Sequence, residues 1–181
     1  PSGLPKLDEL TGGFQGGNLY IVAARPGQGK SALAGGCMYN SAEEGYASAA
    51  YLLEMPAEGF ALRGASKRAR VDSFDLTTGE IDDNQYQTFK AVTEEVAELP
   101  IWMDDTPSLT VEQIYRRLRR LKIQEDIDIA WVDYMQLMKE SGVGGNRDLE
   151  LGHMSRTLKL AAKEFDIPVV ALCQLNRKVE H

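Results

Sequence analysis

The sequence predicts a three-layer α/β fold in which helices cover both faces of a mostly parallel central sheet. Five short apolar runs alternate with five longer segments of helical character along the 181 residues. Most of the apolar runs are continuous, which is typical of strands that are covered on both faces. A glycine-bearing turn joins the first run to the first helix, and such folds bind ligands at the carboxyl ends of their strands.

The strands and helices are expected in alternation. The apolar runs place strands at residues 19–24, 49–53, 101–103, 127–132 and 169–172, and helices at 30–44, 57–70, 83–99, 111–124 and 149–165. The helix over 111–124 is the best defined, because Thr110 and Gln113 form a capping-box pattern at its start. Its apolar positions Val111, Ile114 and Leu118 recur at helical spacing, which predicts one buried face.

The turn after the first expected strand carries the most informative pattern of the chain. Arg25, Pro26, Gly27, Gln28, Gly29, Lys30 and Ser31 follow the apolar run and open the next helix. In such a turn the backbone N–H groups and the helix N-terminus face an anion, a lysine reaches the outer phosphates and a serine hydroxyl ligates Mg²⁺. The strict pattern has glycine where Ala24 stands, and alanine does not tolerate a positive φ. The pattern predicts a nucleoside triphosphate site; a glycine-rich turn before an ordinary helix is the plainer alternative.

Polar side chains also follow three other expected strands. Asp133 ends the fourth apolar run, where it suits a Mg²⁺-associated acid opposite the phosphate loop. Glu54 follows the second run and could polarise an attacking water, or be a surface glutamate that favours a helix dipole. Gln174 follows the last run; its amide could form a hydrogen bond with a γ-phosphate or a water molecule, or it could be a plain loop residue. Because the carboxyl ends of parallel strands meet at one edge, these side chains are expected near the phosphate loop.

Composition limits the class of protein. Hydrophobic residues make up 43% and charged residues 26% of the chain, as in ordinary globular domains. No apolar run reaches the length of a membrane span and the N-terminus lacks a signal-peptide pattern, so we expect a cytoplasmic protein without membrane contact. The formal net charge of −7 argues against a stand-alone, non-specific nucleic-acid binder. Cys37 and Cys173 show no disulfide or zinc spacing and are expected to be core thiols.

Six segments, in order, carry a family resemblance. They are residues 23–31, 53–56 (Leu-Glu-Met-Pro), 78–83, 132–138 (Val-Asp-Tyr-Met-Gln-Leu-Met), 146–150 and 169–177. Together they resemble the RecA-like motor domain of the DnaB-type replicative DNA helicases, bacterial or phage, in which alanine is also usual before the phosphate loop. The resemblance implies that Lys30 and Ser31 hold the phosphates of ATP and Mg²⁺. It further implies that Asp133 is the metal-associated acid, that Glu54 activates water and that Gln174 senses the γ-phosphate.

The same resemblance implies an organisation and partners. Residues 1–181 are expected to be a partial RecA-like helicase ATPase domain, without the family's N-terminal collar domain, C-terminal strands and trans-acting arginine finger. The implied function is the ATP-hydrolysing motor of a hexameric helicase that translocates on single-stranded DNA and unwinds duplex at the replication fork. Expected partners are single-stranded DNA, further copies in a homohexamer, a primase and a helicase loader. Since an arginine finger is worth about 10³–10⁵ in turnover, this segment should bind nucleotide far better than it hydrolyses it.

Two other classes of protein remain open at this point. A RecA- or RadA-like recombinase or DNA-repair ATPase would use the same core, although the Leu-Glu-Met-Pro and Asp-Tyr-Met-Gln-Leu-Met segments favour the helicase. A loader or regulator would bind ATP only as a structural ligand. The presence of both Glu54 and Asp133 argues against such a non-catalytic protein.

Further side chains permit two interpretations each. Arg116, Arg117, Arg119, Arg120 and Lys122 form a basic cluster, which is either a solvated helix face or a strip that meets DNA or a neighbouring subunit. The glycine-bearing loop from Lys139 to Arg147 is either a DNA contact through these two cations or a plain surface loop. Trp102 and Trp131 lie in or beside expected strands and are assigned to the core.

Overall fold

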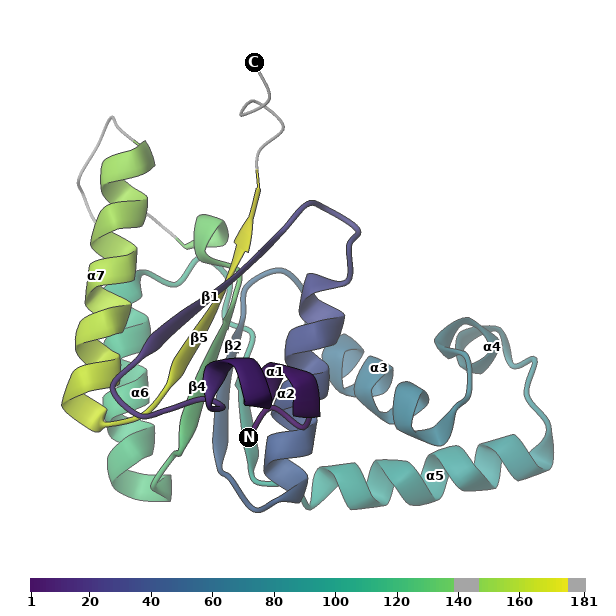
Figure 1. The fold of residues 1–181 in the computed structure, drawn as a ribbon. Helices are drawn as coiled ribbons and strands as arrows, with labels where there is room; N and C mark the ends of the chain where they lie inside the picture. Colours follow the sequence, from purple (N-terminus) through teal and green to yellow (C-terminus); the bar gives the residue numbers. More distant parts are fainter. Residues whose placement is uncertain (139–146, 176–181) are drawn as a thin grey trace.

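The computed structural model describes residues 1–138 and 147–175, which form a parallel sheet flanked by helices (Figure 1). The strands are β1 (Leu19–Ala24), β2 (Ser48–Leu52), β3 (Ile101–Asp104), β4 (Ile129–Asp133) and β5 (Val169–Gln174). All four strand pairings are parallel, and the strand order is β1-β5-β4-β2-β3. The predicted α/β fold class is therefore confirmed, and all carboxyl ends of the strands lie at the same edge of the sheet.

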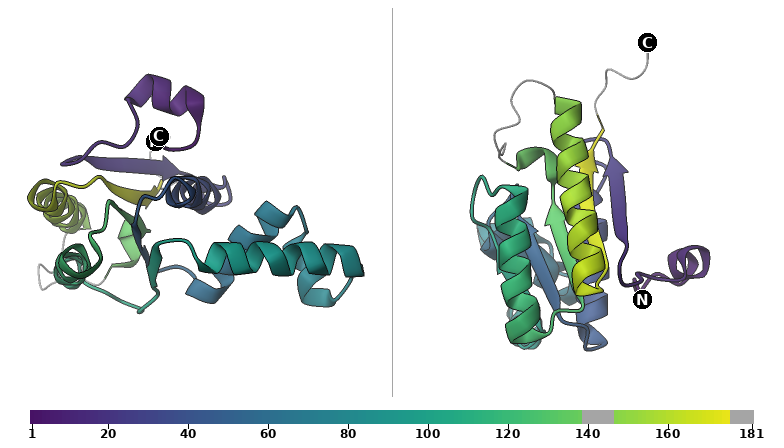
Figure 2. Two further views of the ribbon diagram at one scale, coloured as in Figure 1. Left: turned by 90° about the horizontal axis from the view of Figure 1, so that it is seen from below. Right: turned by 90° about the vertical axis from the view of Figure 1, so that its left-hand side faces the viewer.

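Helices cover both faces of this sheet. They are α1 (Pro5–Thr11), α2 (Lys30–Glu43), α3 (Ala57–Ala69), α4 (Ser73–Thr78), α5 (Asp83–Ala97), α6 (Val111–Glu125) and α7 (Arg147–Phe165), with a short 3₁₀ helix η1 (Met135–Leu137) after β4. Helices α6 and α7 lie side by side on one face, while α2 packs against the strands from the other (Figure 2). Helices α3, α4 and α5 project together from one side of the sheet.

The hydrophobic core has two parts, one on each face of the sheet. Leu118 of α6 and Leu158 of α7 pack against Val132 on one face. Met38 of α2 packs with Trp131 on the other face. Successive residues of β4 thus enter opposite cores, because side chains alternate across a strand. This explains why the apolar run over β4 is continuous rather than alternating.

Every expected strand and helix is present, with its ends shifted by at most two residues. The ladder decides where the strands stop: Asp133 pairs with Leu52, and Gln174 pairs with Ala24. Both polar residues are thus the last residues of strands rather than parts of the following loops. Three short elements, α1, α4 and η1, were not expected, because they are too short to show a helical period.

The predicted capping box at the start of α6 is confirmed. Thr110 Oγ1 accepts a hydrogen bond from the Gln113 N–H at 3.3 Å, and Gln113 Oε1 accepts one from the Thr110 N–H at 2.8 Å. Two backbone donors that a helix N-terminus leaves open are satisfied in this way.

The tryptophans and cysteines that were expected in the core differ in how deeply they are buried. Trp131 is buried, whereas Trp102 is half-buried at the sheet edge and packs only against the margin of the core. Cys37 is a buried free thiol, and Cys173 is a half-buried one. Burial also raises the pKa of the Cys37 thiol above its ordinary value. None of the helices in the described parts of the chain combines the length and apolar character that a bilayer span requires.

The basic cluster on α6 divides into paired and exposed side chains. Arg117 binds the carboxylate of Asp104 and donates to Thr106 Oγ1 at 2.8 Å. Lys122 donates to Asp126 at 2.7 Å and to the Ile127 carbonyl at 2.9 Å. Arg116, Arg119 and Arg120 are exposed. Arg117 thus ties α6 to the end of β3, Lys122 binds the chain at the C-terminal end of α6, and the other three guanidinium groups face solvent.

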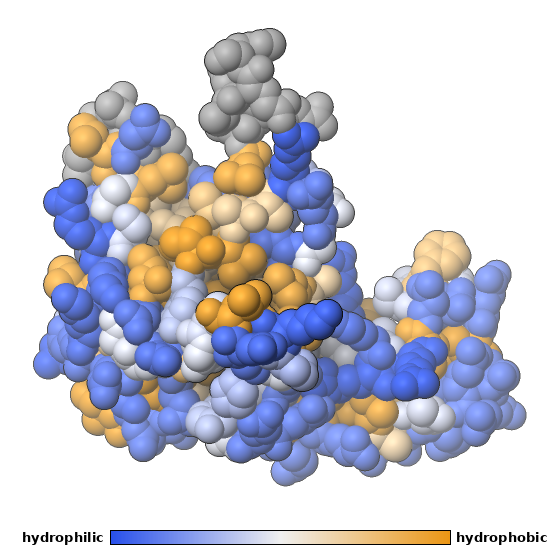
Figure 3. All heavy atoms as spheres, in the orientation of Figure 1, coloured by the Kyte–Doolittle hydropathy of each residue, from blue (hydrophilic) through white to orange (hydrophobic). Residues whose placement is uncertain are grey.

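The outer edge of β1 lies open among the described residues, since β1 pairs only with β5 there. Ile21 on this strand is 49% exposed. Figure 3 shows apolar side chains gathered over β1 on this face of the molecule.

Candidate functional site

The phosphate-loop pattern forms the connection from β1 to α2. Gly27 and Gly29 have φ values of 75° and 79°, in the left-handed region that glycine adopts without strain. Among the described residues, no neighbouring heavy atom lies within 4 Å of where a Cβ would stand at either glycine, so these residues leave open space beside the turn. Ala24 ends β1 in the ladder and is not among the residues with positive φ. The departure from the strict pattern therefore costs the turn nothing.

The N-terminus of α2 presents its backbone donors to this space. Gly29 is its N-cap, and no side chain caps the first turn. The first intrahelical bond runs from the Leu33 N–H to the Gly29 carbonyl at 2.8 Å. The N–H groups of the first turn therefore have no partner within the helix, and with the helix dipole they favour an anion.

Lys30 and Asp133 meet behind the loop. Lys30 Nζ lies 3.8 Å from Asp133 Oδ1, and the two side chains are only 10% and 7% exposed. The same ammonium group sits 4.1 Å from the centroid of the Tyr134 ring, a cation–π contact. The charge pair joins the end of β4 to the first residue of α2, so the structure brings two of the candidate site residues together.

The carboxylate of Asp133 has an unusual environment. Although buried, neither of its oxygens accepts a hydrogen bond within the described part of the chain. A buried carboxylate is normally hydrogen-bonded, so oxygens left open beside a phosphate loop fit a cation or its water ligands. Mg²⁺ is typically held by one or two carboxylates together with substrate phosphates rather than by a full protein cage. The described residues contain no group of three or more His, Cys, Asp or Glu side chains that could hold a metal ion by themselves.

The strand register brings Glu54 and Gln174 to the same edge. Leu52, the last residue of β2, pairs with Asp133, and the Leu53 N–H donates to the Asp133 carbonyl at 2.7 Å. Glu54 follows directly and is exposed. Burial raises the pKa of the Tyr134 hydroxyl, and the negative charges of Glu54 and Asp133 raise it further. Gln174 enters from the other side, where it pairs with the last residue of β1.

Two residues at this edge were not assigned from the sequence. Asp105 Oδ2 accepts a hydrogen bond from the Ala57 N–H at 2.9 Å and so fixes the start of α3, three residues after Glu54. Tyr134 supplies the ring beneath Lys30. Asp105 follows directly after β3, as Glu54 and Asp133 mark the ends of β2 and β4, and this repeated pattern is the signal that could have identified it.

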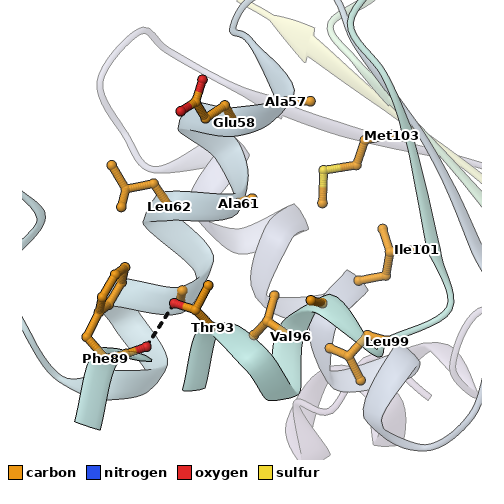
Figure 4. A pocket seen from close by; sticks show the side chains of 12 residues that line it. Ala57, Glu58, Ala61, Leu62, Phe89, Thr93, Val96, Leu99, Ile101 and Met103 are labelled. Carbon is orange, nitrogen blue, oxygen red and sulfur yellow. Dashed lines mark hydrogen bonds between the residues drawn. The ribbon is translucent and has the colours of Figure 1, made fainter. Parts of the chain in front are cut away.

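Other features lie apart from this edge. A cavity of about 540 Å³ between α3, α5 and β3 is lined mainly by apolar side chains, among them Leu62, Val96 and Ile101 (Figure 4). It shares no residue with the phosphate loop. Of the two proposed DNA contacts, Lys139 lies outside the described residues, and Arg147 is the first residue of α7.

Comparisons with known proteins identify the family and the fold. The family model for the DnaB-like helicase C-terminal domain matches residues 1–181. The replicative DNA helicase DnaB of Helicobacter pylori is 36% identical over 182 residues, and the chain spans 37% of that relative's length.

Two solved structures share the fold. One is a DnaB-like replicative helicase studied with its interactions with primase; it has a TM-score of 0.94 and 27% identity, over 99% of this chain and 44% of that one. A second, described as an ATPase domain, has the same TM-score and identity and is covered over 65% of its length. Nucleotide-dependent activity is what this family implies. The chain belongs to the family of DnaB-like helicase C-terminal domains.

Proposed function

We propose that this chain is the ATP-binding and ATP-hydrolysing motor domain of a hexameric replicative DNA helicase. One observation carries the proposal: behind the phosphate loop, Lys30 lies 3.8 Å from Asp133, whose buried oxygens accept no hydrogen bond among the described residues. Glu54 follows β2 at the same edge of the sheet. A glycine-rich turn before an ordinary helix would not need a buried acid without hydrogen bonds. The comparisons support the helicase over a recombinase or a non-catalytic regulator, since the relatives are replicative helicases.

In the proposed site, different residues of the chain bind the phosphates and the Mg²⁺ of Mg·ATP. The backbone from Arg25 through Pro26, Gly27, Gln28 and Gly29 would surround the phosphates, and Lys30 would bind their outer oxygens. The Ser31 hydroxyl and the Asp133 carboxylate would hold Mg²⁺, directly or through water. When bound, Mg²⁺ neutralises phosphate charge. Asp133 fits this role because its oxygens accept no other hydrogen bond among the described residues.

Two residues are proposed to act on the reacting end of the nucleotide. Glu54 is exposed at the end of β2 and would orient a water molecule and accept its proton. The side-chain amide of Gln174 would donate a hydrogen bond to the γ-phosphate and would respond when hydrolysis removes this phosphate. Both roles need groups at the same sheet edge as the phosphate loop, and the register with Ala24 and Asp133 provides this.

The proposal extends to the assembly. Residues 1–181 would form part of a RecA-like domain that works in a cytoplasmic homohexamer on single-stranded DNA, with a primase and a helicase loader as partners. Lys139 and Arg147 are the proposed DNA contacts. With a net charge of −7, a lone subunit would be repelled by the DNA phosphates. Tight DNA binding would therefore rely on local positive charge such as that of Lys139 and Arg147, presented by several subunits at once, rather than on the net charge.

The Glu54→Gln variant tests the chemistry. It keeps the size and hydrogen bonding of the side chain but removes the basic oxygen, so the full-length helicase should bind ATP as before while hydrolysis falls sharply. Calorimetry and steady-state ATPase measurements give the two quantities. Turnover at the parental rate would assign the role to another acid.

Oligomeric state tests the assembly. The 181-residue chain is expected to be mainly monomeric and to bind Mg·ATP with negligible DNA-stimulated hydrolysis. The full-length protein should form six-fold rings whose ATPase rises with single-stranded DNA and falls with added salt. Sedimentation, electron microscopy and ATPase titrations measure these properties. Helical filaments would favour the recombinase. DNA unwinding by the 181-residue chain alone would contradict the expectation that an arginine finger from outside these residues completes the active site.

A further inference from the structure

Gln136 makes a two-point contact with the backbone of Gln174. Gln136 Oε1 accepts a hydrogen bond from the Gln174 N–H at 3.1 Å, and its Nε2 donates to the Gln174 carbonyl at 2.9 Å. The same Nε2 lies 2.8 Å from Cys173 Sγ. Gln136 is the middle residue of η1 and follows Asp133 by three positions. One side chain after β4 therefore holds both backbone polar groups at the tip of β5.

This contact continues the sheet where the main-chain pairing between β4 and β5 ends. The register of these two strands runs from Ala130↔Val169 to Val132↔Ala171. Gln174 lies beyond that register on the β4 side, while on the other side it pairs with Ala24 of β1. A carboxamide carries one acceptor and one donor in the same arrangement as a backbone amide, so Gln136 can replace the missing strand residue.

We propose that Gln136 is a positioning residue that couples the segment carrying Asp133 to Gln174. The inference rests on the proposed function, in which Gln174 donates to the γ-phosphate. Gln136 fixes the tip of β5 to the segment after β4 on one side. On the other side, the pairing of Gln174 with Ala24 fixes this tip to the start of the phosphate loop. Gln136 itself contacts the backbone of residue 174, so it acts on the nucleotide only through Gln174.

The carboxamide of Gln136 has one end that donates and one that accepts a hydrogen bond, and two substitutions remove these interactions differently. Gln136→Ala removes both hydrogen bonds. Gln136→Glu keeps the shape and one acceptor but cannot donate to the Gln174 carbonyl, and it places negative charge against that oxygen. If the two-point contact matters, both variants of the full-length helicase should lose kcat, whereas nucleotide affinity should stay within about twofold, since the phosphate loop is intact. Outer-shell partners of metal ligands, which act through another residue in the same way, cost ~10–100-fold in activity when mutated, and we expect a loss of kcat of this order.

A matched control and a double variant separate positioning from general damage. Gln124→Ala, at an exposed position of α6, should leave ATPase activity unchanged. If Gln136 acts through Gln174, the Gln136→Ala/Gln174→Ala protein should turn over no more slowly than Gln174→Ala alone, since coupled residues are non-additive. Thermal unfolding of each protein checks that the fold is retained.

The outcomes are distinct. A parental kcat for Gln136→Glu, or losses that multiply in the double variant, would overturn the inference while leaving the proposed function standing. A Lys30→Ala protein that binds and hydrolyses ATP normally would instead overturn the proposed function. Reduced kcat with retained affinity in both Gln136 variants, without a further loss in the double variant, supports the coupling.

Discussion

Removing the charge of Lys30 tests the central pair of the site. Lys30 Nζ and Asp133 Oδ1 are 3.8 Å apart, and their side chains are 10% and 7% exposed. At an effective dielectric constant of about 20, two unit charges at this separation attract each other by about 4 kcal/mol before their desolvation is deducted. Lys30→Ala leaves Asp133 buried without this cation. We therefore expect the free energy of unfolding without nucleotide to fall by about 3–5 kcal/mol.

Urea unfolding of the single and double variants measures this coupling. If the uncompensated carboxylate causes the loss, Lys30→Ala/Asp133→Asn should recover about 1 kcal/mol or more relative to Lys30→Ala. A double variant as unstable as Lys30→Ala would refute the electrostatic argument. The loss would then belong to the packing of the lysine against the Tyr134 ring.

The same variant should lose nucleotide affinity. A charge-assisted hydrogen bond contributes about 1.5–3 kcal/mol, so calorimetry of Lys30→Ala should show affinity for Mg·ATP reduced by about 10- to 150-fold. The expected stability loss requires that folding be checked by circular dichroism at the temperature of the titration. Unchanged affinity in the folded variant would contradict the phosphate-loop assignment.

Three further predictions concern the scaffold. A Cβ at Gly64 would overlap the ring and the hydroxyl group of Tyr39, so Gly64→Ala should lower the free energy of unfolding in urea by about 1–3 kcal/mol. A neutral effect would show that α3 or the Tyr39 side chain can shift. Burial raises the pKa of Asp104, but hydrogen bonds, including that from Arg117, outweigh it and hold this pKa below its usual range. Because this pKa is lower in the folded state than in the unfolded state, the ionised carboxylate stabilises the fold above about pH 4, and this contribution is lost as pH falls through the folded-state pKa. The free energy of unfolding of Asp104→Asn should therefore be lower than that of the parent at pH 7, and the difference should shrink in acid. Thr110→Ala should cost about 1 kcal/mol through loss of the capping box, and an unchanged melting temperature would assign the helix start to packing alone.

The local parts of the site were predictable from the sequence, and the parts that join distant segments were not. A strand, a glycine turn and a helix start are contiguous, so the phosphate loop could be assigned from neighbouring residues. Asp133 likewise ends a recognisable apolar run. The hydrogen bond from the Ala57 N–H to Asp105, in contrast, depends on β2 and β3 being neighbours in the sheet. The sequence alone contains no direct record of strand order, so this contact could not be foreseen.

The burial of individual side chains was likewise predictable at some positions and not at others. The run at β4 predicted a strand with both faces covered, and Trp131 is buried accordingly. Trp102 was expected in the core on the same grounds, but β3 is the edge strand of the described sheet, and only one of its sides has a neighbouring strand. Short helices such as α1 and α4 carried only capping signals, among them Asp72, whose side chain accepts a hydrogen bond from the Phe74 N–H at 2.8 Å.

The strand order also has a consequence for how the protein folds. Residue 24 pairs with residue 174, so the strand that leads into the phosphate loop finds its partner in β5, after the chain has passed through every other strand. Pairings between such distant segments form slowly, because the entropy of closing a long loop is lost before the contacts are gained. A nascent or partly folded chain would therefore hold the glycine turn and α2 before Asp133 is placed against Lys30 and before Gln174 is paired with Ala24. Nucleotide binding should appear only at the last stage of folding, and ATP should stabilise the completed sheet over its intermediates.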